Sequence, residues 1–109
     1  MGSSRRICSR AWSKRLRQFS DPEKAQRRAK EYLGSHAQLC VATNPDKKYR
    51  IQDPHTGKWT HFGQMGYEDF TRHHDLSRRR KYLTRSSRIK GSWRNNRYSA
   101  NNLSRHILW

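Results

Sequence analysis

The sequence predicts a small α+β domain in which an antiparallel sheet of two or three strands packs against two or three helices. Residues 37–62 alternate apolar and polar side chains around two turn signals, which is typical of short β-strands. Residues 21–33 and 76–90 carry apolar or small side chains at helical spacing and have capping residues at their ends. A chain of 109 residues forms one domain with a small core.

The chain is strongly basic, with 25 lysines and arginines, 8 acidic residues and a net charge of +17. Apolar residues make up 31% of it, well under the usual fraction of about 45–50%. The charge is unevenly spread, because residues 1–20 and 76–109 contain no acidic residue and residues 45–75 are neutral overall. Cationic ends around a neutral middle indicate a polyanionic partner, either nucleic acid or an acidic protein surface.

Residues 1–19 predict a basic amphipathic helical arm that precedes a domain formed by residues 20–109. The apolar residues at helical spacing are Cys8, Trp12, Leu16 and Phe19. Two interpretations stay open: the apolar stripe packs on the domain, or the arm grips phosphate or an acidic groove. An Arg-rich start without acids also resembles an organellar transit peptide, as a further alternative.

The two cysteines and the absence of long apolar runs bear on the compartment. Cys8 and Cys40 lie 32 positions apart without metal-ligand spacing, so free thiols are expected, with a disulfide as the alternative. No apolar run reaches the roughly 18 residues that a membrane span needs. We therefore expect a protein of the cell interior or of a virion, without a membrane span.

The first long helix is predicted to begin near residue 21, because Ser20 and Glu23 form a capping box and Pro22 suits a first helical turn. Its small or apolar face holds Ala25, Ala29, Tyr32 and Leu33, and Gly34 ends it. Strands are predicted at 37–43, 48–52 and 58–62, the last two joined by a turn at 53–57.

Residues 59–75 are expected to be the folded centre, since they combine several aromatic residues with two glycines and three acids. Gly63 and Gly66 predict a glycine-hinged turn, and Tyr67 and Phe70 are expected to anchor the following loop to the core. The residues predicted to form the core or to dock a partner are Tyr49, Trp59, Phe62, Gly63, Gly66, Tyr67, Phe70, Tyr82, Leu83, Trp93 and Trp109.

A second long helix is predicted from about residue 76 to residue 90, capped by Asp75 and closed by Gly91. Its apolar or small face would hold Leu76, Tyr82, Leu83, Ser86 and Ile89. The helix would carry seven cations and no acidic residue, which is more positive charge than a solvent-exposed face needs. This excess favours contact with an anion. The predicted polyanion-binding residues are Arg5, Arg6, Arg10, Lys14, Arg15, Arg17, Arg78, Arg79, Arg80, Lys81, Arg85, Arg88, Lys90, Arg94 and Arg97.

Residues 91–102 are expected to form a polar loop with Trp93 and Tyr98 as anchors, followed by a short helix and a buried C-terminus. Arginines interleaved with aromatic residues can stack on bases, although the aromatic rings can equally hold the loop to the core.

No pattern of catalytic or metal-ligating residues stands out. The closest candidate is a nuclease-like set of His61, Glu68, Asp69 and His73, but no HExxH, His/Cys quartet, P-loop or nucleophile elbow is present. We therefore expect no enzyme activity, no metal or other cofactor, and no small-molecule substrate.

Several segments together resemble a family of small basic proteins encoded by nucleocytoplasmic large DNA viruses, the giant-virus assemblage. The resemblance covers roughly residues 45–109. Its motifs are KKYRI at 47–51, DP at 53–54, the run from Trp59 to Phe70 with HFGQMGYEDF, RR at 78–79, YLTR at 82–85, IKGSW at 89–93, YSANNL at 98–103 and the final LW.

The resemblance implies a viral setting and no catalytic role. The resulting hypothesis is a non-enzymatic structural protein of a large DNA virus, a minor capsid or core component whose partners are other capsid or core proteins and nucleic acid. The alternatives are a DNA- or RNA-binding protein that packages a viral genome, and a basic ribosomal protein.

Overall fold

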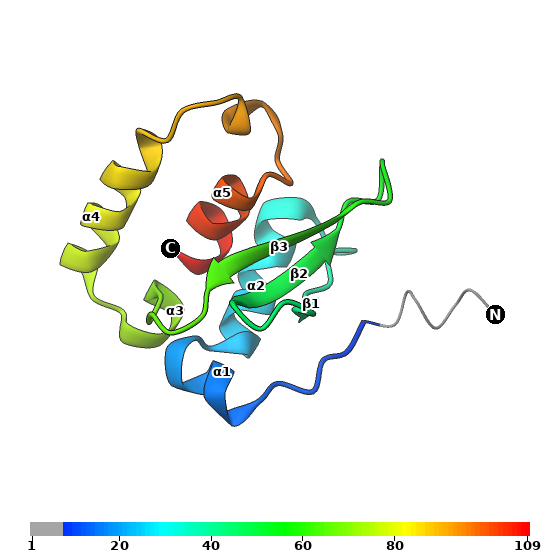
Figure 1. Cartoon of the computed structure of the whole chain (residues 1–109), viewed down its shortest axis with the longest axis horizontal. Coiled ribbons are helices and arrows are strands. Elements are labelled where there is room, and N and C mark those ends of the chain that lie inside the picture. The colour runs from blue at the N-terminus through cyan, green and yellow to red at the C-terminus, as the bar shows by residue number, and fades with distance from the viewer. Residues whose placement is uncertain (1–7) are drawn as a thin grey trace.

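A computed structural model describes residues 8–109, and it confirms the α+β class (Figure 1). The order of elements is α1 (Lys14–Phe19), α2 (Pro22–Leu33), β1 (Cys40–Val41), β2 (Lys47–Gln52), β3 (Trp59–Gln64), α3 (Phe70–His73), α4 (Leu76–Ser87), the 3-10 turn η2 (Trp93–Asn95), α5 (Ala100–Leu103) and the π-helical turn η3 (Ser104–Leu108).

The sheet is antiparallel with the strand order β1-β2-β3. Its register places Tyr49 opposite Phe62 and Val41 opposite Tyr49. Tyr49, Ile51 and Phe62 are buried, as the alternation of the sequence predicts.

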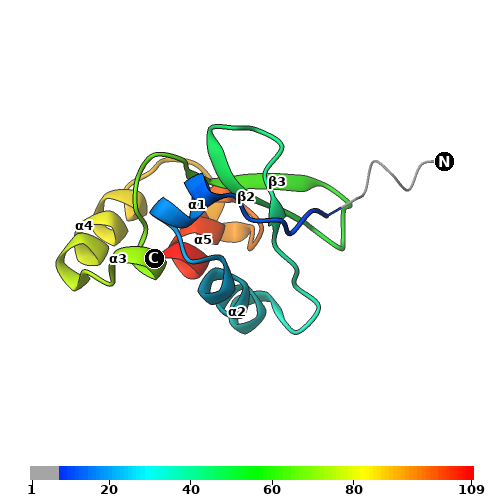
Figure 2. The same cartoon turned by 90° about the horizontal axis from the view of Figure 1, so that it is seen from below.

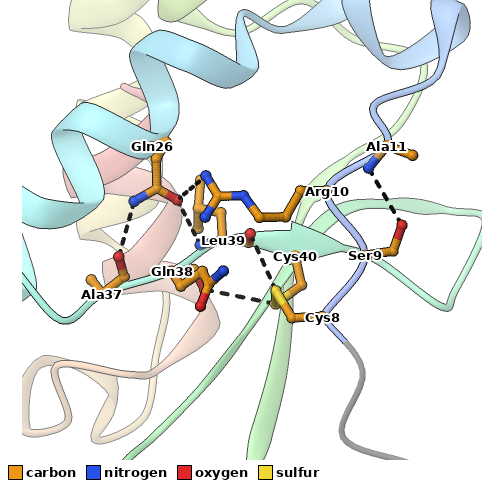
Figure 3. Close-up of a disulfide and its surroundings, with 9 residues drawn as sticks. All are labelled: Cys8, Ser9, Arg10, Ala11, Gln26, Ala37, Gln38, Leu39 and Cys40. Carbon is orange, nitrogen blue, oxygen red and sulfur yellow. Dashed lines mark hydrogen bonds between the residues drawn. A yellow bond between two sulfur atoms is a disulfide. The ribbon is translucent and has the colours of Figure 1, made fainter. Parts of the chain in front are cut away.

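β1 is shorter than the predicted strand at 37–43. The side chain of Gln26 explains this, because its amide donates to the carbonyl of Ala37 and its oxygen accepts from the amide of Leu39 (Figure 3). A helix side chain thus satisfies backbone groups that a strand ladder would otherwise use.

The C-terminal segment α5–η3 lies between α2 and the sheet (Figure 2). Leu103, Ile107 and Leu108 are almost fully buried and join Ala25 and Ala29 of α2 in one core. The small side chains of these alanines allow α2 and the C-terminal segment to approach closely. The alanine spacing in the sequence of α2 indicates such close packing. The predicted burial of the C-terminus is therefore confirmed, with Trp109 itself half-buried.

Asp21 caps α2, so the predicted capping box is wrong. Its side chain accepts from the amide of Lys24, while the hydroxyl of Ser20 is buried and shares a hydrogen bond of 2.7 Å with the hydroxyl of Tyr49. Glu23 instead forms an ion pair of 2.9 Å with Arg17. A tertiary contact 29 residues away removes the local cap that the sequence offers.

Within residues 8–19, the described part of the predicted arm, the helix is shorter than predicted, since α1 comprises Lys14–Phe19. Residues 1–7 of the arm lie outside the described residues. Residues 8–13 run without regular structure along β1, where the amide of Val41 donates to the carbonyl of Ser9. Leu16 is buried and Trp12 packs edge-on against Tyr49. From residue 8 onward, this segment therefore packs on the same core as the rest of the chain.

Cys8 and Cys40 form a disulfide, so the expectation of free thiols is wrong (Figure 3). Their Cα atoms lie 5.0 Å apart, which is within the range that a disulfide needs. The spacing of two cysteines that lie 32 residues apart gives no information about such a pairing.

α4 has the predicted start, because the Asp75 carboxylate accepts from the amides of Ser77 and Arg78. It ends at Ser87, before the predicted end at 89 or 90. Its predicted apolar face is partly wrong, since Leu76 and Ile89 are 67% and 52% exposed while Ser86 is buried. Both polar contacts and the stacking of Tyr82 on Trp109 join α4 to the C-terminal segment.

Candidate polyanion-binding site

A cavity of about 500 Å³ lies where the end of β3, the 66–68 loop, α4 and the C-terminus meet. Its lining residues are Lys48, Gly63, Gln64, Tyr67, Glu68, Arg78, Lys81, Tyr82, Arg85, Ser104, Leu108 and Trp109. The segments that line it are far apart in sequence, and the fold alone brings them together.

Gly63 forms the part of the cavity where the sheet meets the C-terminus. A Cβ atom there would lie 2.8 Å from Leu108 Cδ1 and 3.1 Å from Lys48 Cβ. Its φ angle is +82° and that of Gly66 is +99°, so the predicted glycine-hinged turn is confirmed. The missing side chain at Gly63 allows β3 to approach η3.

Two stacked aromatic rings form one wall of the cavity. The rings of Tyr82 and Trp109 lie 4.3 Å apart at 12°. The guanidinium of Arg79 donates to the carbonyl of Trp109 and lies 5.5 Å from the ring of Phe70. Arg79, which the sequence places among the anion-binding cations, instead fixes the C-terminus against α4.

Tyr67 is 69% exposed, so its predicted role as an anchor in the core is wrong. The loop is held by its backbone, because Lys48 Nζ donates to the carbonyl of Tyr67 at 2.6 Å. The aromatic ring is thereby left free at the mouth of the cavity. Among the described residues it makes no ring contact.

A buried ion pair supports the loop from behind the cavity. Lys48 Nζ lies 3.1 Å from Asp69 Oδ2, and both side chains are almost fully buried. Loss of solvation lowers the pKa of Lys48, and the neighbouring Asp69 opposes that shift. Carbonyl oxygens of Phe19 and Tyr67 accept from the same ammonium group. All three of its donors are thus occupied, which indicates a structural role.

Three cations of α4 face the cavity because they recur at intervals of three and four residues. Arg78 forms an ion pair of 3.3 Å with Glu68. Lys81 and Arg85 are exposed, and within residues 8–109 no carboxylate pairs with either. The rim therefore carries two positive charges, one helical turn apart, that no acid balances.

The structure separates the other predicted cations into two groups. Arg17 pairs with Glu23, Arg10 donates to Gln26, Arg94 lies over Trp93, and Arg97 lies over Tyr32. The exposed ones whose side chains make no ion pair, hydrogen bond or ring contact within the described chain are Lys14, Arg15, Arg80, Arg88 and Lys90. Arg5 and Arg6 lie outside the described residues.

The remaining predicted core or docking residues are half-buried on the body of the domain. Trp59 lies under the guanidinium of Arg50, at 4.1 Å, and Trp93 donates its indole N–H to the carbonyl of Ile89. Phe70 and Leu83 are half-buried. These rings are occupied by contacts within the chain.

Arg105 has a structural role that sequence reasoning missed. Its guanidinium donates to the carbonyl of Leu83 at 2.7 Å and to the hydroxyl of Ser86, and it lies 5.5 Å from the ring of Trp93. One cation near the C-terminus therefore holds α4 in place. Nothing in its local sequence distinguishes it from the other arginines.

The four residues of the nuclease-like set have separate environments. His61 bonds with Thr43, and Glu68 pairs with Arg78. Asp69 is buried against Lys48, whereas the ring of His73 lies 5.2 Å from that of Trp109. Within residues 8–109 no group of three or more His, Cys, Asp or Glu is placed to hold a metal ion. In the same part of the chain, no helix is long and apolar enough to cross a membrane.

Comparison with known proteins gives one match. A protein-family model described as a family of unknown function, DUF5754, matches residues 37–86, which include the sheet, α3 and almost all of α4. No curated protein and no solved structure matches the chain. The matched part thus includes two sides of the cavity, the β3 end with its loop and α4, and leaves out the C-terminal side.

Proposed function

We propose that this protein is a non-enzymatic, nucleic-acid-binding component of a large DNA virus particle, and that α4 is its main contact surface. The viral setting is inferred from the sequence resemblance. The binding role is inferred from the charge of α4 and from its position.

The observation that carries this proposal is the unbalanced charge of α4. The helix contains Arg78, Arg79, Arg80, Lys81 and Arg85 and no acidic residue. Of these, Arg79 donates to the carbonyl of Trp109, and Arg78 forms an ion pair with Glu68. Arg80, Lys81 and Arg85 are exposed, and like charges this close repel each other unless an anion lies between them.

Nucleic acid explains more of this surface than an acidic protein does. Phosphates satisfy the cations, and bases offer flat faces to aromatic side chains. The cavity presents both features together, because Lys81, Arg85 and Tyr67 all line it. An acidic protein surface would use the cations and leave the aromatic ring without a partner.

The test measures DNA affinity against salt. Fluorescence anisotropy with a labelled strand of about 15 nucleotides is recorded from about 50 to about 200 mM KCl. The variant Arg80→Gln/Lys81→Gln/Arg85→Gln is compared with Arg27→Gln/Lys30→Gln/Lys58→Gln, which removes the same charge from exposed positions on other elements. We expect the α4 variant to reduce the slope of log K against log salt by about 2, and the control variant to change it less.

Equal slopes for the two variants would contradict α4 as the contact surface. Failure of the wild-type protein to bind DNA near about 150 mM salt, with retention on nuclease-treated particles, would refute nucleic acid as the partner and identify an acidic shell protein instead.

A further inference from the structure

The cavity beside α4 has the size and lining of a ligand site. Its volume of about 500 Å³ lies within the usual range of about 300–1,000 Å³ for sites that bind small molecules or single groups. Tyr82, Leu108 and Trp109 form an apolar wall, and Lys81 and Arg85 form a cationic rim. An apolar wall with a cationic rim suits a flat aromatic group that carries a negative charge at its edge.

The exposure of Tyr67, an aromatic side chain that lines this cavity, has no explanation in the packing of the fold. An aromatic ring that is 69% exposed contributes little to folding, and its own backbone carbonyl already fixes the loop through Lys48. The other two rings of the cavity are stacked on each other. Tyr67 therefore provides the open aromatic face on which a second ring can stack.

Glu68 narrows the class of ligand. Its carboxylate lines the same cavity and pairs with Arg78, which leaves Lys81 and Arg85 on the rim without an ion pair to any described residue. A polyphosphate or a strongly acidic peptide would meet this carboxylate at close range. A neutral base with a single phosphate fits better. The amino group or ring N–H of the base can donate a hydrogen bond to the carboxylate, and the single negative charge of the phosphate can interact with the cations.

We propose that this cavity binds one unpaired nucleobase of a single-stranded nucleic acid, stacked on Tyr67, with the adjoining phosphate held between Lys81 and Arg85. This inference rests on the proposed function and specifies its ligand. A base within a duplex is stacked on both faces and paired at its edge, so it cannot enter without being extruded. The protein therefore prefers single strands to duplexes of equal length.

The test compares Tyr67→Ala, Tyr67→Phe and Ile89→Ala by anisotropy with a single strand and a duplex of about 15 nucleotides or base pairs each. Ile89 is a matched control, because it is 52% exposed, lies beyond the end of α4 and does not line the cavity. Both positions are exposed, so the three variants leave the core unchanged.

We expect Tyr67→Ala to weaken single-strand binding roughly 5- to 150-fold, the usual range for loss of one stacked base, and to leave duplex binding unchanged. Tyr67→Phe should keep the affinity because it keeps the ring, and Ile89→Ala should have no effect.

An equal effect of Tyr67→Ala on both ligands, or no effect on either, would overturn the base site. The α4 glutamine variant distinguishes the two proposals. If it weakens binding while Tyr67→Ala does not, the α4 surface stands and the base site falls. Absence of binding by the wild-type protein to either ligand refutes the proposed function itself.

Discussion

At the scale of single residues, the interaction between Lys48 and Asp69 joins three parts of the chain. Lys48 lies on β2, its ammonium reaches the carbonyl of Phe19 at the end of α1, and Asp69 caps α3 by accepting from the amide of Thr71. Burial of two charges is costly, and partners on every side offset that cost. The position of the Tyr67 loop therefore depends on an ion pair that is hidden from solvent.

Asp69→Ala is predicted to destabilise the protein by about 3–5 kcal/mol, because it leaves the Lys48 charge buried without its partner. Urea unfolding followed by circular dichroism measures this change. The matched control is Glu68→Ala, which breaks an ion pair whose side chains are 48% and 39% exposed, and a change within about 1 kcal/mol is expected. Similar losses for the two variants would show that burial of the Lys48–Asp69 pair does not matter.

At the scale of elements, contacts between distant segments hold α4 and the N-terminal segment. Arg79 donates to the carbonyl of Trp109, Arg105 donates to the carbonyl of Leu83, and the amide of Asn101 donates to the carbonyl of Ser86. These polar contacts fix one face of α4 and leave the other cations in solvent. The N-terminal segment is held differently, by the disulfide to β1, by burial of Leu16 and by backbone hydrogen bonds that the amides of Val41 and Asp69 donate.

Reduction of the Cys8–Cys40 disulfide is predicted to destabilise the protein by about 3–4 kcal/mol, since the bond closes a loop with a sequence separation of 32 residues. The measurement is the urea midpoint of the wild-type protein with and without dithiothreitol. Cys8→Ser is the control, and its midpoint should be low under both conditions. A wild-type midpoint that does not respond to reduction would contradict this contribution.

At the scale of the whole molecule, the high positive charge affects the histidines. Burial lowers the pKa of His61, His73 and His106, and neighbouring arginines lower each of them further. His106 is stacked on Tyr32 at 4.4 Å with Arg28, Arg97 and Arg105 nearby. Folding therefore disfavours protonation of these three histidines.

Stability is predicted to fall as the pH drops below about 6.5. In that range the histidines of the unfolded chain bind protons, whereas those of the folded protein stay neutral because their pKa values are lower. The free energy of unfolding at about pH 7.5 and about pH 5.5 checks this, and carboxylates contribute little in that window. His106→Gln should reduce the pH dependence by removing one of the three groups. A stability that stays constant or rises on acidification would refute the assignment.

Much of the fold follows from local patterns. The β2–β3 hairpin, α2 and the start of α4 occur where alternation, helical spacing and the Asp75 cap predict them. The basic character of α4 can likewise be predicted from the sequence, because it depends only on which residues the helix contains. The sequence likewise places positive φ angles at Gly63 and Gly66, where side chains would be strained.

Only the tertiary structure decides which of these residues are free to act. Arg79 and Arg105 turn inward, while Lys81 and Arg85 form no ion pair within residues 8–109. Tyr67 is exposed, and its loop is held through the backbone by a lysine 19 positions away. Cys8 and Cys40 likewise meet through the packing of distant segments. Spacing along a chain reports neighbours within a few residues. The cavity depends on contacts between segments that are tens of residues apart, and their energies are set by burial and geometry in the folded state.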